Sequence, residues 1–385
     1  MAKKTLWTNA NVYTPDGVIP NGRILVSGDG RIEAVGGAEV EDAEAVRRDA
    51  GGALLLPGLI DVHNHGGFGA HTNDARTESL ETISRYHAAH GTTAFLPTTN
   101  TDEAERIEAA LKVAAREMER DFEGADIVGI HLEGPFLSEA KRGAQRKEHL
   151  LLPTLERRQR FYEASEGNIR LVTIAPEIEQ GMEAVEWFAA QGVTVSIGHS
   201  NATYEEAMEA VKRGARHTTH HFNGMSALHH RQPGVAGAGL TCDELTIEII
   251  ADGHHVHPAV IQASFALKTP NRVCLITDSV NCSGLPDGEY GGVLVKDGVI
   301  KLTGTDTLAG SSLTAWRGLC NAVRFTGLPL ETVLPSFTAV PARQAGISHR
   351  KGTLAPGMDA DFILVSPQME LLATYVRGRK VYEAS

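Results

Sequence analysis

The sequence predicts an α/β protein with a (β/α)8 barrel of the TIM type and a small β-sandwich formed by both chain ends. The middle of the chain alternates apolar strand patterns with helical patterns about eight times. Both ends carry strand and turn signals without helices between them. At 385 residues, the chain is too long for one small core. We therefore expect residues 1–55 and 350–385 to form the small domain and residues 56–349 to form the barrel.

The two chain ends have the same character. Residues 5–13 and 23–26 alternate apolar and polar side chains and are separated by turns rich in Gly and Asp, such as residues 28–30. Residues 361–365 and 373–382 have the same pattern at the other end. Two β-rich ends that flank a different middle predict that the termini meet in one small sheet domain.

The first barrel strand is an apolar run over residues 54–66, which ends in His63 and His65. Side chains alternate along a strand, so both imidazoles are expected on one face. Burying two titratable rings without a partner is costly, which favours a metal site over two hydrogen-bonded core histidines. Further strands are expected at residues 92–97, 126–133, 169–174, 193–199, 217–222, 246–251 and 272–278. A helix is expected from Thr203, which has a capping-box spacing to Glu206, to Gly214.

Polar side chains end several of these apolar strands, where a barrel of this kind carries its active site. They are His63, His65, Glu133, His199, His220 or His221, and Asp278. Imidazole and carboxylate ligands suit borderline cations, which lower the pKa of bound water to about 7. A carboxylate beside the metal can accept a proton and deliver it to a leaving group, and Asp278 is the best candidate. Periodicity leaves the choice between His220 and His221 open.

Composition and charge exclude several classes of function. A formal net charge of −12 argues against general binding to nucleic acid or to anionic membranes. No stretch approaches the roughly 20 apolar residues of a membrane span, and no signal peptide is recognisable, so we expect a cytoplasmic protein. The four cysteines lack C-x-x-C spacing and are expected to be buried apolar residues.

Residues 57–66 (PGLIDVHNHG) resemble the opening motif of the amidohydrolase superfamily. Further segments are similar to the N-acetylglucosamine-6-phosphate deacetylases within it, and the resemblance covers nearly the whole chain. HLEGPF at residues 131–136 and GHSNAT at residues 198–203 are the most specific. The others are residues 91–93, 96–99, 219–225, 231–234, 251–255, 277–278, 284–288 and 308–311.

The resemblance implies a barrel with a small β-sandwich and a divalent-metal site. It selects His220 as the inward ligand and places the main metal on Glu133, His199 and His220. Because His63 and His65 are both present, the chain is similar to the two-metal members, with Glu133 as the bridge. Residues 169–177 contain no lysine that could serve as a carboxylated bridge. Zinc is the first expectation, and iron, manganese or cobalt suit the same ligands.

The implied reaction is hydrolysis of the acetamide of N-acetylglucosamine 6-phosphate, with Asp278 as the acid and base. It would release acetate and glucosamine 6-phosphate in amino-sugar catabolism. Asn223, Gly224 and Arg231 match the phosphate-binding segment, and His255 matches the histidine on the sugar side. In the family that arginine can come from the neighbouring subunit, which implies a homodimer. The remaining pocket residues by motif position are Ala144, Leu308, Ala309 and Gly310.

Gln145 stands where the family usually has a histidine that contacts the sugar. Glutamine can donate and accept hydrogen bonds but cannot become cationic. The sugar preference is therefore open, and N-acetylgalactosamine 6-phosphate is an alternative substrate. Another amidohydrolase activity, such as that of an aminoacylase, and a non-catalytic sugar-phosphate sensor are the remaining alternatives. The extra histidines His229, His230, His254 and His257 are expected in loops and are given no role.

Overall fold

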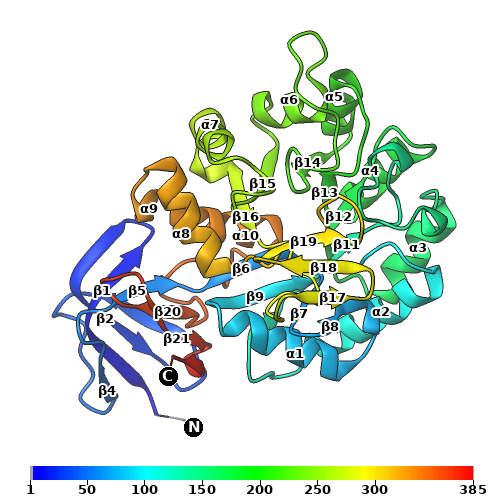
Figure 1. Ribbon diagram of the computed structural model, residues 1–385. Coiled ribbons are helices and arrows are strands. Elements are labelled where there is room, and N and C mark those ends of the chain that lie inside the picture. The colour runs from blue at the N-terminus through cyan, green and yellow to red at the C-terminus, as the bar shows by residue number, and fades with distance from the viewer. Residues whose placement is uncertain (1–2, 385) are drawn as a thin grey trace.

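We describe a computed structural model of the chain, which covers residues 3–384. A part made of β-strands, to which both chain ends belong, lies beside a larger part of strands and helices (Figure 1). None of the helices in residues 3–384 has the length and apolarity needed to cross a bilayer.

The two chain ends form one eight-stranded mixed sheet in the order β22-β21-β20-β5-β1-β2-β3, with β4 paired to β1. Strands from the two ends meet where β20 runs antiparallel to β5, with Ile363 opposite Leu56. The prediction that the termini meet in one sheet is confirmed. The strands are β1 (Thr5–Thr14), β2 (Gly17–Val26), β3 (Ile32–Gly36), β4 (Val46–Asp49), β5 (Leu54–Pro57), β20 (Phe362–Val365), β21 (Leu371–Val376) and β22 (Arg379–Glu383).

The middle of the chain holds two parallel sheets, a three-stranded one in the order β10-β9-β6 and a six-stranded one in the order β11-β12-β13-β14-β15-β16. The predicted alternation of strands and helices is confirmed. The strands are β6 (Leu59–Asn64), β9 (Thr92–Pro97), β10 (Asp126–Ile127), β11 (Ile130–Glu133), β12 (Ile169–Ile174), β13 (Thr194–Ile197), β14 (Ala215–Thr218), β15 (Thr246–Ile250) and β16 (Val273–Ile276).

Contacts join these two parallel sheets at both sides. A parallel bridge pairs Thr98, after β9, with His131 of β11. On the other side, the amide of Asp278, after β16, donates to the carbonyl of His63 in β6 at 2.9 Å. The carboxyl ends of the strands therefore converge on one region.

Helices pack outside the parallel strands and bury their apolar faces against them. Helix α5 begins at the predicted capping box, in which the Thr203 side chain accepts from the Glu206 amide and the Glu206 side chain accepts from the Thr203 amide. The helices are α1 (Thr77–Ala88), α2 (Ala104–Glu117), α3 (Leu155–Ala164), α4 (Gly181–Ala190), α5 (Tyr204–Lys212), α6 (Gly234–Thr241), α7 (Pro258–Lys268), α8 (Ala315–Thr326), α9 (Leu330–Val333) and α10 (Ala339–Gln344).

Two predicted strands are each divided. The run at residues 54–66 breaks at Gly58, so β5 joins the terminal sheet and β6 joins the parallel sheet. A side chain at Gly58 would collide with Thr93, 2.1 Å from the ideal Cβ position. The expected strand at residues 126–133 separates into β10 and β11 around Gly129, whose φ of 155° interrupts the ladder.

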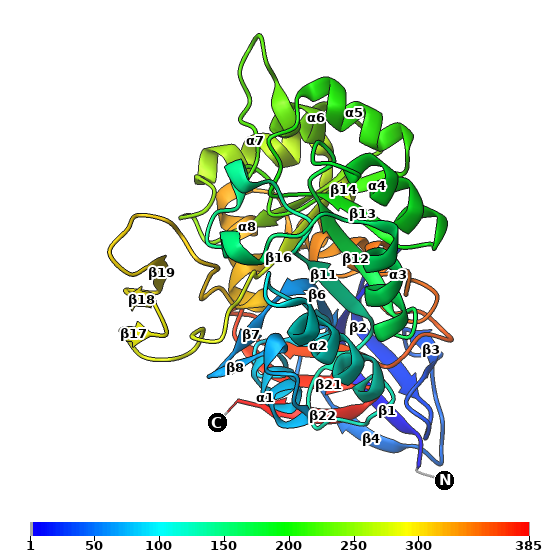
Figure 2. The ribbon, with the colours of Figure 1, turned by 90° about the vertical axis from the view of Figure 1, so that its right-hand side faces the viewer.

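A three-stranded antiparallel insertion, which the sequence patterns did not predict, follows β16. It consists of β17 (Gly288–Tyr290), β18 (Val293–Lys296) and β19 (Val299–Leu302). The insertion extends away from the main body, beyond the carboxyl ends of the parallel strands (Figure 2). It brings Val293 and Leu302 to the cavity described next. The short pair β7 (Gly66–Gly67) and β8 (Ala70–His71) lies near the same end.

Candidate active site

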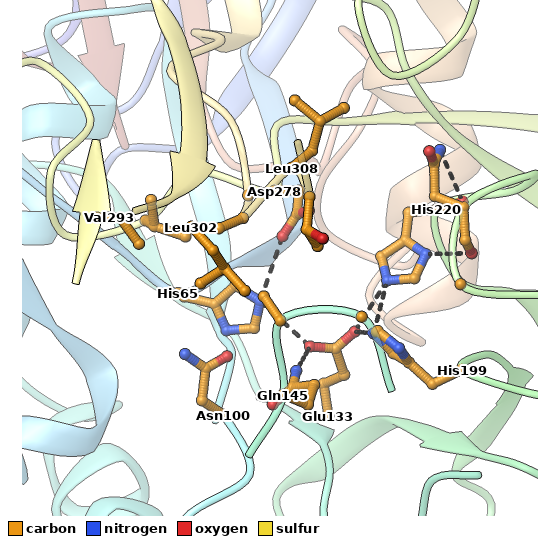
Figure 3. Close-up of a pocket in the computed structure, with 18 of the residues that line it drawn as sticks. His65, Asn100, Glu133, Gln145, His199, His220, Asp278, Val293, Leu302 and Leu308 are labelled. Atoms are coloured by element: carbon orange, nitrogen blue, oxygen red, sulfur yellow. Dashed lines mark hydrogen bonds and ion pairs between the residues drawn. The ribbon is translucent and has the colours of Figure 1, made fainter. Parts of the chain in front are cut away.

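The predicted metal and acid/base residues converge at the carboxyl ends of the parallel strands (Figure 3). His63 lies in β6, and Glu133 is the last residue of β11. His65, His199, His220 and Asp278 lie just beyond their strands, so the strands expected to include the last three end earlier. All six side chains are buried. The polar residues that end five separate strands therefore form one cluster.

Three of these residues have an unusual backbone conformation. The φ angles are 45° for His199, 28° for His220 and 51° for Asp278. Residues other than glycine seldom adopt positive φ, and such residues concentrate at functional sites. The turn at each strand end aims the side chain into the cluster instead of continuing the strand.

His199, His220 and Glu133 form the first group of metal-ligand type. The two Nε2 atoms are 3.1 Å apart, and Glu133 Oε1 is 3.3 Å from His199 Nε2 and 3.2 Å from His220 Nε2. Each Nδ1 faces a backbone carbonyl, that of Lys141 at 2.8 Å and that of Asn223 at 3.1 Å. Because a carbonyl only accepts, the Nδ1 atoms carry the protons, and the Nε2 lone pairs face one another. A cation between them fits this arrangement.

His63, His65 and Glu133 form the second group. Glu133 Oε2 is 3.2 Å from His65 Nε2, and Glu133 Oε1 is 3.6 Å from His63 Nε2. His63 Nε2 and Glu133 Oε1 are buried and have no hydrogen-bond partner among the described residues. Unpaired buried polar atoms are rare, and a bound cation would satisfy both. Since Glu133 belongs to both groups, its carboxylate lies where a bridging ligand would be.

The neighbouring charges determine the ionisation of Glu133. Burial disfavours its charged form, but the imidazoles of His63, His199 and His220 around it hold the pKa of its carboxyl well below the ordinary value. Glu133 is therefore a carboxylate at neutral pH, the form that binds a metal.

Asp278 lies beside the second group, with Oδ1 3.3 Å from His65 Nε2 and 3.6 Å from His63 Nε2. Burial opposes its ionisation, but the hydrogen bond from His65 and the charge on His63 lower its pKa below the ordinary aspartate value. The side chain lines the cavity and is ionised at neutral pH. It can therefore accept a proton there.

The cluster opens into a cavity of about 480 Å³. The structure brings most of the predicted substrate residues to its wall, and Leu302 and Val293 from the insertion cover one side (Figure 3). The predicted residues at the wall are Ala144, Gln145, Asn223, Gly224, His255, Leu308, Ala309 and Gly310. His255 is fixed by Asp252, whose Oδ2 is 2.6 Å from its Nδ1.

Gln145 contacts the Glu133 carboxylate directly. Its Nε2 donates to Glu133 Oε2 at 2.9 Å, and its Oε1 accepts from the Thr101 amide at 2.9 Å. An amide nitrogen has two N–H donors, so one remains for a ligand. The side chain therefore holds Glu133 in place and can still contact the sugar.

Arg231 does not line this cavity. It lies in the segment between β14 and α6, which projects beyond the helices (Figure 1). Its Nη1 is 2.8 Å from His230 Nε2, and the neighbouring His229 and Leu228 are also exposed. Within one chain, the structure does not bring this predicted phosphate ligand to the other site residues.

The structure adds four residues that the sequence patterns did not single out. His71, Asn100 and Arg146 line the cavity. Glu248 lies in β15 behind the histidines, with Oε2 2.9 Å from His63 Nδ1. An acidic residue in the middle of an apolar strand was the available signal for Glu248. His221, by contrast, points away from the site, with Nδ1 2.9 Å from Thr218 Oγ1 and Nε2 3.1 Å from the Ala236 carbonyl.

A parallel α/β fold with two histidine–carboxylate groups at its strand ends is typical of a metal-dependent hydrolase. Comparison with known proteins identifies the family of hydrolases. The profile of the amidohydrolase family matches residues 54–381. The chain is 38% identical to N-acetylglucosamine-6-phosphate deacetylase of Bacillus subtilis over 98% of this chain and 97% of that protein. It is 34% identical to N-acetylgalactosamine-6-phosphate deacetylase of Escherichia coli O157:H7 over 96% of this chain and 97% of that protein.

A solved structure agrees with these matches. N-acetyl-D-glucosamine-6-phosphate deacetylase of Mycobacterium smegmatis, a mutant in complex with N-acetyl-D-glucosamine-6-phosphate, aligns with a TM-score of 0.92 and 32% identity over 99% of this chain and all of that chain. The chain therefore belongs to the amidohydrolase family and, within it, to the N-acetylglucosamine-6-phosphate deacetylases.

Proposed function

We infer that this protein hydrolyses the acetamide of N-acetylglucosamine 6-phosphate, giving glucosamine 6-phosphate and acetate. The observation that carries the inference is the cluster of two histidine groups that share Glu133, with ionised Asp278 beside them at the wall of a cavity. This cluster lies in a chain that is 38% identical, nearly end to end, to a deacetylase of that specificity.

We propose that the two parallel sheets close into one barrel, residues 56–349, because contacts join them at both sides. The barrel has eight strands when β10 and β11, the two parts of one predicted strand, are counted together. The sheet formed by residues 1–55 and 350–385 would be the small sandwich domain. We also propose that the protein is cytoplasmic and forms a homodimer.

One or two divalent ions per chain, with zinc as the first expectation, would be held by His63, His65 and Glu133 and by Glu133, His199 and His220. When bound, such ions polarise a carbonyl oxygen and lower the pKa of a bound water towards 7. The chain itself fixes the ligands: the carbonyls of Lys141 and Asn223 orient two imidazoles, and Gln145 holds one oxygen of Glu133.

Asp278 has the proton-transfer role in this proposal. As a carboxylate it accepts a proton from the attacking water, and as an acid it returns the proton to the departing nitrogen of the sugar amine. Burial excludes bulk water from the ligand side chains, which strengthens their electrostatic effect on the reacting carbonyl.

The substrate is proposed to lie along the cavity wall. Asn223 and Gly224 would contact the phosphate, His255 and Gln145 the sugar, and residues 308–310 and Ala144 would line the pocket. Arg231 would bind the phosphate from the neighbouring subunit of a homodimer, since it does not line the cavity of its own chain. Guanidinium groups suit phosphate oxygens.

The neutral side chain of Gln145 makes N-acetylgalactosamine 6-phosphate a second candidate substrate. The test is acetate release by metal-analysed protein from three substrates: N-acetylglucosamine 6-phosphate, its galactosamine epimer and unphosphorylated N-acetylglucosamine. We expect the highest kcat/KM with the first. Preference for the galactosamine epimer would make N-acetylgalactosamine 6-phosphate the assigned substrate. If fully metallated protein released no acetate from any of the three substrates, the proposal would be refuted.

A further inference from the structure

Glu248 is a buried carboxylate at the middle of β15, directly behind the two ligand groups. Its side chain is fully buried in the parallel sheet. Among the described residues, its ion-pair partners are the imidazoles of His63 and His217, with no lysine or arginine. An ionised carboxylate in such a place is costly unless several donors converge on it.

One oxygen of Glu248 connects the two ligand groups. Oε2 accepts from His63 Nδ1 at 2.9 Å and from the backbone amide of His220 at 2.9 Å. His63 belongs to one group and His220 to the other. The second oxygen, Oε1, is 3.0 Å from His217 Nε2, and His217 belongs to neither group.

These two bonds have separate effects on the ligands. Since a carboxylate only accepts hydrogen bonds, the bond from His63 requires a proton on Nδ1, which leaves the Nε2 lone pair directed at Glu133. The bond from the His220 amide holds a residue whose φ of 28° is unfavourable for a side chain other than glycine. The same atom therefore sets the tautomer of one ligand and the backbone of another.

We propose that Glu248 is a positioning residue that sets the affinity of both cation sites, through His63 and through the backbone of His220. The inference rests on the proposed metal-dependent function. Partners of this kind, behind a metal ligand, typically change metal affinity or activity 10–100-fold when they are replaced. Glu248→Gln is the sharpest change, because an amide keeps the volume but removes the negative charge that the His63 and His220 donors face.

The experiment measures metal affinity as well as turnover. Metal-free protein is titrated with Zn²⁺ in competition with a chromophoric chelator. We expect Glu248→Gln to lose about 10–100-fold in affinity, mainly at the site that contains His63. Glu117→Gln is the matched control, since Glu117 is a buried carboxylate in α2 that pairs with Arg116 away from the site. The control should retain both affinities.

Wild-type affinity at both sites in folded Glu248→Gln would overturn the inference. So would an equal loss in Glu117→Gln, since that outcome would indicate a general effect on the fold. Acetate release by the unaltered protein tests the proposed function independently. If that protein binds zinc but deacetylates none of the sugars, the activity is refuted, while the affinity comparison still decides the role of Glu248.

A measurement on the unaltered protein tests the inference even if Glu248→Gln does not fold. In zinc-loaded protein labelled with 15N-histidine, the His63 signals are assigned by comparison with His63→Gln. A protonated Nδ1 on His63 with metal on Nε2 supports the inference. Metal on Nδ1 with a proton on Nε2 overturns it.

Discussion

Two buried clusters of charged groups among the described residues differ in whether a lysine lies among their members. At the junction of the terminal sheet and the parallel sheet, Lys351 Nζ is 3.0 Å from Asp126 Oδ2 and 3.1 Å from Asp359 Oδ2, and it also bonds Asp361. Burial alone would lower the pKa of Lys351, but the three carboxylates hold it above the ordinary lysine value. That cluster contains its own cation.

The cluster at the strand ends contains carboxylates and imidazoles but no lysine or arginine among its described members. His63 Nε2 and Glu133 Oε1 are left without hydrogen-bond partners. Burial of charge therefore does not by itself mark a functional site. A cluster completed by a lysine holds two parts of the fold together, whereas a cluster that lacks a cation is prepared to bind one.

The largest expected effect concerns Asp278 in the incomplete cluster. Asp278→Asn keeps the shape of the side chain but removes its ability to accept a proton, so acetate release should fall about 10²–10⁴-fold. The rate is measured with the preferred sugar phosphate, and metal content is analysed in the same sample. Wild-type turnover with full metal content would assign the proton transfer to another group.

Lys351→Met removes the cation from the complete cluster. Breaking a buried ion pair by deleting one partner costs about 3–5 kcal/mol, because the remaining charges are left uncompensated. We expect a loss of that size in the free energy of unfolding measured with urea. Lys301→Met is the control, since Lys301 pairs at 2.9 Å with the fully exposed Asp306, and exposed pairs contribute about 0–1 kcal/mol. Equal losses in both variants would contradict the comparison.

Metal removal should destabilise the fold through the incomplete cluster. An ion at a free concentration 100 times its Kd stabilises the native state by about 2.7 kcal/mol. Treatment with a chelator should therefore lower the melting temperature of the wild type. The same treatment should have a smaller effect on His199→Asn with His220→Asn, which keeps only the group of His63, His65 and Glu133. A wild-type melting temperature that does not respond to chelator and added zinc would contradict the assignment.

An effect that appears only on acidification concerns His221, the residue next to His220. Both of its ring nitrogens have partners, and burial lowers its pKa to about 3. The unfolded chain binds this proton near pH 6.5, so stability is full above that pH and falls as pH decreases towards 3. In metal-free protein, His221→Gln should reduce the slope of unfolding free energy against pH by about 1.4 kcal/mol per pH unit. An unchanged slope between pH 6 and pH 4 would show that His221 is not kept neutral.

Strand periodicity and strand-end polarity predicted the alternation of strands and helices and five of the six central residues, because both depend on local pattern. Alternation places His63 and His65 together, and apolar strands that end in polar residues locate a site. The pattern could not separate His220 from His221. Both lie beyond the end of β14, where the turn, and not the alternation of a strand, sets the direction of each side chain.

Glu248 and the insertion β17–β19 were missed for a different reason. A carboxylate within an apolar strand is stabilised by donors from β6 and the end of β14, and such contacts across a sheet leave no mark on neighbouring positions of the sequence. Two predicted strands divide at Gly58 and Gly129, where neighbouring side chains leave no space for a Cβ, and these contacts are not evident from composition. Arg231 belongs to a motif, but it does not line the cavity of its own chain.

The positive φ angles of His199, His220 and Asp278 matter for laboratory evolution of this protein. A left-handed backbone costs residues other than glycine about 1–2 kcal/mol each. A random library selected for heat resistance in the presence of a chelator would therefore favour glycine at these three positions, and the selected clones would be more stable and inactive. Any such selection needs a second screen for acetate release in every round.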